Sequence, residues 1–303
     1  MHIAEPELNY IINIRIPDYH VGDCFLAVIM MYIDCLCGES SDLLQFAWFF
    51  AYSDVGNALQ LVDFEEIHDY VRRRYGISFG FLRNYMNGDA ETIIMNELKE
   101  KRPVGLTVDY RYCPWAQNTY REEYTYHFVL VVGYTEDEYL CVDNETNFVW
   151  PINKKKVHEM TREMLLFKGN AVKSSEYNCQ KAFLSKDYMY KRRNMNSDLD
   201  RIATSILRSA DVETSYFWSS KLRLISYNYS NFGLFLEKYL VKTNAGMIVD
   251  ETARDFRLLS LFCLKLYQRR NVSLLKKFMD KIRQIKDNEV KIRLELEGAT
   301  FKV

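Results

Sequence analysis

The stretch HFVLVVGYTEDEYLCVDN, residues 127–144, decides the fold of the first half of the chain. Its two apolar runs are rich in β-branched and aromatic residues, which is typical of buried strands, and the polar segment Thr135–Asp137 separates them as a turn. The pattern predicts an antiparallel hairpin. In such a hairpin the start of one strand lies beside the end of the next, so His127 and Asp143 are expected to lie close together.

Helices are expected to precede this hairpin. The run CFLAVIMMYI is apolar on every side, so it predicts a core helix over about 22–37. Periodicity and capping residues predict further helices over about 42–51, 63–76, 89–102 and 154–167. Strands are expected at 104–110, 127–134, 138–144 and 148–152, the last ended by Pro151. Helices followed by an antiparallel sheet indicate the α+β class.

Beyond about residue 170 the pattern changes to helices alone. Amphipathic spacing predicts them over 198–210, 217–242, 250–270 and 273–296, with Asp250 as the first residue of the third. Such a set is typical of an all-α bundle. We therefore expect a first domain over 1–170 and a helical domain over 171–303.

Composition restricts the classes of function. The chain has 303 residues, 48% of them hydrophobic, with a net charge of −1 and a pI of about 6.5. A balanced charge gives no electrostatic basis for binding nucleic acid or an anionic membrane. The sequence has no long apolar run and its first residues do not resemble a signal peptide, so a cytoplasmic protein is expected. Seven scattered cysteines predict reduced thiols and no metal site.

Cys24 stands at the start of the predicted core helix. A helix N-terminus carries unpaired N–H groups and a partial positive charge, and both stabilise a thiolate. The alternative is that Cys24 is a small buried hydrophobic residue, as most free cysteines are. His127 and Asp143 could likewise be ordinary strand-end residues. Together, however, the three predict a nucleophile, a base and a carboxylate that orients the base.

Two motifs resemble a known family. PVGLTVDYRYCPW (103–115) and YHFVLVVGYTEDEYLCVDN (126–144) are similar to the N-terminal domain of butirosin biosynthesis protein H, within the papain-like, C39 peptidase-like group. The resemblance covers about residues 10–170. It implies a papain-like fold whose catalytic residues are Cys24, His127 and Asp143.

The resemblance implies an acyltransferase of specialised biosynthesis. Such enzymes move an acyl group from a carrier-protein thioester, a phosphopantetheinyl thioester, to an amine, and need no bound cofactor. The implied partners are an acyl or peptidyl carrier protein and a small amine. Two alternatives stay open: a C39-like peptidase, thioesterase or amide hydrolase, and a non-catalytic papain-like binding domain.

One position departs from the peptidase pattern. C39 peptidases place a glutamine six residues before the cysteine to complete the oxyanion hole, whereas this chain has Asp18 there. An ionised aspartate only accepts hydrogen bonds, so it opposes an oxyanion. Asn13 or His20 could supply the donor instead if the loop is longer. The residues expected to line the substrate are Asp18, His20, Asp109, Tyr110 and Trp115.

Overall fold

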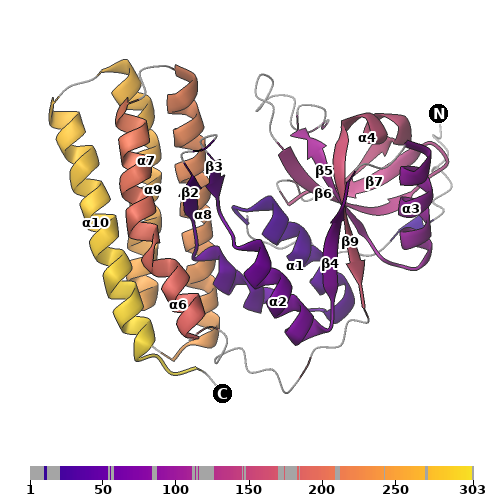
Figure 1. Ribbon diagram of the computed structural model, residues 1–303, viewed down its shortest axis with the longest axis horizontal. Coiled ribbons are helices and arrows are strands. Elements are labelled where there is room, and N and C mark those ends of the chain that lie inside the picture. Colours follow the sequence, from indigo (N-terminus) through magenta and orange to yellow (C-terminus); the bar gives the residue numbers. More distant parts are fainter. Residues whose placement is uncertain are drawn as a thin grey trace, which may run out of the picture. The chain divides into compact units, whose positions relative to one another are not determined.

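The computed structural model describes residues 10–11, 21–53, 55, 58–83, 87–110, 113, 115, 126–144, 146, 148–169, 174, 183, 185–208, 212–241, 243–269 and 272–301. The chain forms two compact units, shown in Figure 1. The sheet unit comprises Met1–His20, Cys24–Ser40 and His68–Ser174, and the helical unit comprises Val21–Asp23, Ser41–Ile67 and Ser175–Val303. The chain thus passes between the units several times, whereas the predicted division into 1–170 and 171–303, which stays a prediction, assumes one crossing.

The sheet unit is built on an antiparallel sheet with the strand order β4-β9-β5-β6-β7-β8. A further short strand, β1, pairs with β6. The strand bounds are β1 Tyr10–Ile11, β4 Ser78–Leu82, β5 Val104–Asp109, β6 Tyr126–Tyr134, β7 Glu138–Val142, β8 Val149–Asn153 and β9 Thr161–Lys168. The predicted hairpin is confirmed, since β6 and β7 pair antiparallel with Leu130 opposite Val142. The α+β class is confirmed as well.

Helices cover both faces of this sheet. Their bounds are α1 Cys24–Cys37, α3 Asn87–Lys99 and α4 Lys154–Met160. Figure 1 shows α1 on one side of the sheet and α3 and α4 on the other. In α1 the nine residues from Phe25 to Ile33 are all buried, so the helix that was predicted to be apolar all round does lie in a core. It approaches β5 closely at Gly105, where an added Cβ would lie 2.9 Å from the Leu165 Cβ of β9 and 3.4 Å from Val28.

The prediction of one helix over 154–167 is wrong. Helix α4 ends at Met160, where Thr161 turns extended (φ −81°, ψ 134°) and its hydroxyl donates to the Val157 carbonyl at 2.7 Å. Strand β9 then runs between β4 and β5. The spacing of EMLLF suits a helix or a strand, and the decision comes from pairing with residues far away in the sequence.

Proline 151 does not end its strand, as had been expected, but lies inside β8. Strand β8 pairs with β7 and stands at the end of the sheet order. An edge strand tolerates proline because the N–H that proline lacks has no neighbouring strand to bond on the outer side.

The helical unit is a bundle with one small hairpin. Its elements are η1 Ser41–Ala47 (a 3₁₀ helix), β2 Ala51–Ser53, β3 Ala58–Gln60, α6 Lys186–Arg193, α7 Met195–Arg208, α8 Val212–Tyr239, α9 Ala245–Gln268 and α10 Val272–Glu297. The four C-terminal helices are confirmed, although α9 begins at Ala245 instead of Asp250. The predicted helix over 42–51 is wrong in type, because it is a 3₁₀ helix that gives way to β2. Helix α6 was not predicted.

Helix α2, Phe64–Tyr75, follows the predicted cap. The Asp63 side chain accepts a hydrogen bond from the Glu66 backbone N–H at 2.9 Å, which satisfies one of the free donors at the helix start. Glu66 itself binds the buried guanidinium of Arg192, at 2.9 and 3.1 Å. The capping pattern in the sequence thus marks the true helix start.

The core of the helical unit encloses a carboxylic acid. Glu289 of α10 is fully buried, and it accepts hydrogen bonds from Trp48 Nε1 at 3.1 Å and from Tyr229 Oη at 2.5 Å. Burial raises the pKa of Glu289 to about 7, against the lowering effect of both hydrogen bonds. This acid therefore titrates near neutral pH.

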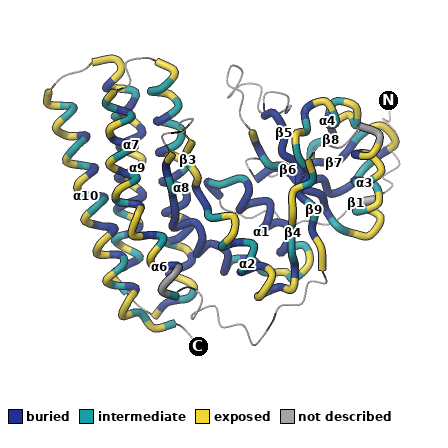
Figure 2. Tube along the Cα trace, in the orientation of Figure 1, coloured by how far each residue is buried: buried dark blue, intermediate teal, exposed yellow. Residues whose placement is uncertain are grey.

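Burial follows the elements as the sequence pattern predicts. In Figure 2 the central strands and α1 are almost wholly buried, whereas the helices of the helical unit alternate between buried and exposed positions. Within the part of the chain that the structure describes, no helix is long and apolar enough to cross a membrane.

Candidate functional site

The β6–β7 hairpin brings His127 and Asp143 together. Strand β6 reaches back to Tyr126, and Asp143 directly follows the last residue of β7. His127 Nε2 lies 2.9 Å from Asp143 Oδ1, and both side chains are buried, at 6% and 0% exposure. The out-and-back path of the chain, read from the sequence, therefore yields a direct hydrogen bond between imidazole and carboxylate.

Cys24, the first residue of α1, lies on the other side of the same imidazole. Its side chain hydrogen bonds to His127, and because Asp143 engages Nε2, the Nδ1 atom remains for the sulfur. Cys24 is half-buried. The structure thus places all three side chains in one chain of hydrogen bonds.

The charges around His127 favour its protonated form. Burial alone would lower the pKa of His127, but the negative charges of Asp143 and Cys24 and their hydrogen bonds to the ring raise it well above the usual 6.5. The imidazole is thus held between the Asp143 carboxylate and the Cys24 side chain. This arrangement can carry out nucleophilic attack followed by proton transfer to a leaving group.

Burial and Asp143 raise the thiol pKa of two other cysteines, Cys141 and Cys113. Burial raises the pKa of Cys141 to about 12, and Asp143 adds to the effect. Burial, Asp143 and Cys141 likewise raise the pKa of Cys113. Both remain neutral thiols at physiological pH, so neither competes with Cys24 as a nucleophile.

Of the residues expected to line the substrate, Tyr110 and Asp109 lie in the described part of the sheet unit, whereas Asp18 and His20 do not. The Tyr110 ring lies 4.2 Å from the His127 ring, centroid to centroid, and is buried. Asp109 is also buried and pairs in register with Tyr126, and its charge contributes to the raised pKa of Cys113. Asp18 and His20 lie outside the residues that the structure describes.

Trp115 contacts the site in a way that the sequence did not suggest. We expected it to line the substrate, but its indole Nε1 donates a hydrogen bond to Asp143 Oδ2 at 2.6 Å. Its ring stacks on Trp150, with the centroids 5.3 Å apart and the planes at 29°. The sequence contains no signal for this contact, since residues 115 and 143 belong to no common periodic element.

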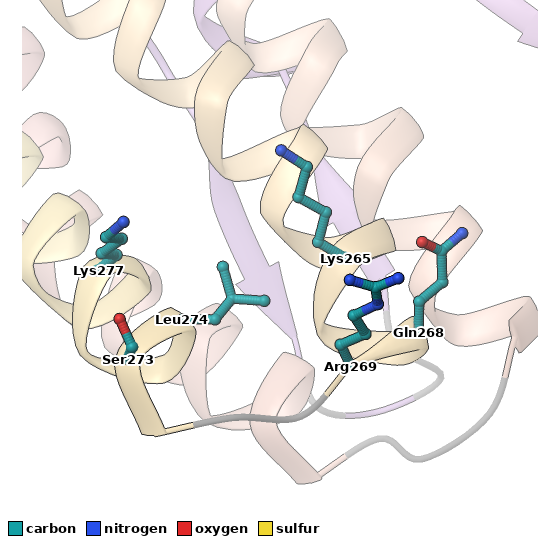
Figure 3. A pocket seen from close by; sticks show the side chains of 6 residues that line it. All are labelled: Lys265, Gln268, Arg269, Ser273, Leu274 and Lys277. Carbon is teal, nitrogen blue, oxygen red and sulfur yellow. The ribbon is translucent and has the colours of Figure 1, made fainter.

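A pocket of about 490 Å³ opens elsewhere, where α9 ends and α10 begins (Figure 3). It is lined by Lys265, Gln268, Arg269, Ser273, Leu274 and Lys277. The lining carries three cations and no acid, and the pocket belongs to the helical unit alone. Neither Cys24, His127 nor Asp143 lines it.

No cluster of three or more His, Cys, Asp or Glu side chains that could hold a metal ion occurs among the described residues. Comparison of the chain with curated proteins gives no match. Residues 42–144 match the family model described as butirosin biosynthesis protein H, N-terminal. The match includes His127 and Asp143, and Cys24 precedes it. Over these residues the chain is similar to the butirosin biosynthesis protein H N-terminal family, and the resemblance drawn from its motifs is confirmed.

Proposed function

We propose that this protein is a cysteine-dependent acyltransferase of specialised biosynthesis, which moves an acyl group from a carrier-protein thioester to an amine. The observation that carries the proposal is the hydrogen-bonded series from Cys24 through His127 to Asp143. The family match supports a biosynthetic role, because its description names an antibiotic biosynthesis protein.

In the first half-reaction the Cys24 thiolate attacks the thioester carbonyl carbon. A new C–S bond to Cys24 forms, the C–S bond to the carrier's phosphopantetheine breaks, and the departing sulfur takes the proton from His127. This leaves an acyl-enzyme and a neutral imidazole. The raised pKa of His127 suits this step, since the ring then holds its proton until a leaving group needs it.

In the second half-reaction an amine attacks the acyl-enzyme. The C–N bond forms, the C–S bond to Cys24 breaks, and the neutral His127 accepts the proton that the amine loses. The Cys24 thiolate and the imidazolium are thereby restored. Asp143 stabilises the cationic ring in both half-reactions, because it stays hydrogen bonded to Nε2.

The helix start supplies help for the oxyanion. Cys24 is the first residue of α1, and the first N–H groups of a helix have no partner within it. The Cys24 backbone N–H can therefore donate to the carbonyl oxygen as it gains negative charge. A thioester demands less of this stabilisation than an amide does, which favours thioester chemistry over proteolysis.

The proposal is tested by incubating the protein with acyl-pantetheine and acyl-carrier thioesters and measuring intact mass. We expect an acyl adduct on the wild type and none on Cys24→Ala. Cys37→Ala is the matched control, because Cys37 is a half-buried cysteine at the other end of the same helix. Cys37→Ala should acylate like the wild type.

The outcomes also separate the alternatives. An adduct that releases mainly free acid when amines are present would assign a thioesterase or amide hydrolase instead. An adduct that persists in Cys24→Ala would refute the assigned nucleophile. If no thioester in the panel forms an adduct, the acyltransferase proposal fails and a non-catalytic papain-like domain is the better description.

A further inference from the structure

Both carboxylate oxygens of Asp143 are engaged by ring N–H groups. Oδ1 faces His127 Nε2 at 2.9 Å, and Oδ2 accepts from Trp115 Nε1 at 2.6 Å. Rotation of the carboxylate about its own axis would break both contacts at once. Because Asp143 has 0% exposure, this orientation is set by protein groups and not by bulk water.

Trp115 is itself held by contacts that return to Asp143. Its ring stacks on Trp150, whose Nε1 donates to Thr146 Oγ1 at 2.8 Å. The Thr146 backbone N–H in turn donates to the Asp143 carbonyl at 3.2 Å. The contacts form a closed cycle through the turn after β7, so the indole N–H has a fixed place relative to the carboxylate.

We infer that Trp115 is a positioning residue, whose indole N–H holds the Asp143 carboxylate in the orientation that aligns His127 with Cys24. The inference rests on the proposed role of Cys24 as the nucleophile. A hydrogen bond to a charged group contributes more than a neutral one, and a buried carboxylate needs its donors to remain ionised. The opposing interpretation is that Trp115 serves only as an aromatic surface that stacks on Trp150.

Trp115→Phe separates the two interpretations, since phenylalanine keeps the stack and removes the N–H. The measurement is the rate of Cys24 alkylation by iodoacetamide against pH, followed by mass spectrometry of the Cys24 peptide. We expect Trp115→Phe to be alkylated about tenfold more slowly at pH 7, the size of the loss of one hydrogen bond to a charge. Its pH profile should also move.

Trp218→Phe is the matched control. Trp218 is fully buried in the helical unit and packs edge-on against Tyr52 at 5.3 Å. The control variant should keep the wild-type alkylation profile. Alkylation needs no acyl substrate, so the test gives an answer even if no thioester acylates the protein.

A second readout follows the hydrogen bond itself. The chain has four tryptophans, so an ¹⁵N-labelled sample gives four indole cross-peaks, and the one lost in Trp115→Phe belongs to Trp115. We expect that proton to resonate downfield and to shift in Asp143→Asn. The inference is overturned if Trp115→Phe is folded and its alkylation rate and pH profile match the wild type. It is also overturned if the Trp115 indole peak has the same chemical shift in Asp143→Asn as in the wild type. In either case Trp115 is a stacking residue.

Discussion

The buried acid of the helical unit offers a quantitative test through the variant Glu289→Gln. A protonated glutamic acid has one donor and one acceptor, and glutamine reproduces that pattern without a charge. Glutamine can therefore accept from Trp48 and donate toward Tyr229, the two groups that contact Glu289. The variant should resemble the wild type at low pH and differ from it at high pH.

The magnitude follows from the pKa of Glu289, which burial raises from its ordinary 4.5 to about 7. The folded state then holds a proton that the unfolded state has lost between these values, so wild-type stability falls as pH rises through that window. Above pH 7 the full difference costs about 3 kcal/mol. Near pH 5 the cost is below about 1 kcal/mol, since that pH lies only half a unit above the ordinary pKa of 4.5.

The assay is urea unfolding at pH 5 and pH 8, followed by far-UV circular dichroism, which reports on the helices. We expect the free energy of unfolding of Glu289→Gln, relative to wild type, to rise by about 2 kcal/mol between the two pH values. Glu297→Gln is the control, because it makes the same substitution at an exposed position of α10. An equal difference between Glu289→Gln and wild type at both pH values would refute the reasoning.

Two further predictions concern the sheet unit. Gly105→Ala should destabilise the sheet unit by about 1–3 kcal/mol through overpacking, because the new Cβ would lie 2.9 Å from a β9 side chain. Gly80→Ala is the control, since nothing lies within 4 Å of its added Cβ. Thermal unfolding compares the two variants, and equal melting temperatures would contradict the steric argument. In the double variant Asp143→Asn, Cys24→Ala the pKa of His127 should fall below 6.5, because burial lowers it and the two groups that raise it are gone. NMR titration of the histidines measures this pKa. A value still above 6.5 would contradict the stated causes.

The sequence identified the elements whose signals are local. An apolar run without a polar face predicted helix α1, and two apolar strands around a polar turn predicted the hairpin β6–β7. The cap at Asp63 marked the start of α2. In each case the evidence lies within about twenty residues, over which side-chain periodicity and turn chemistry are decisive.

The sequence failed where distant segments decide the structure. Strand β9, Thr161–Lys168, pairs with β4, Ser78–Leu82, which is far away along the chain. The apolar spacing of β9 alone suggested a helix. Residues 41–67 belong with the C-terminal helices, although they lie between segments of the sheet unit. Contacts such as Arg192 with Glu66 hold them there, and no periodic pattern announces such a pair.

The candidate site divides in the same way. Sequence alone determined that Cys24 starts a helix and that His127 and Asp143 flank a hairpin, because those features follow from local backbone preferences. Only the tertiary structure decided that one imidazole lies between the sulfur and the carboxylate, and that the Trp115 indole engages the carboxylate's second oxygen. A hydrogen bond tolerates a change of only a few tenths of an ångström in the distance between donor and acceptor. That distance is set by packing across the sheet and not by the spacing of residues along the chain.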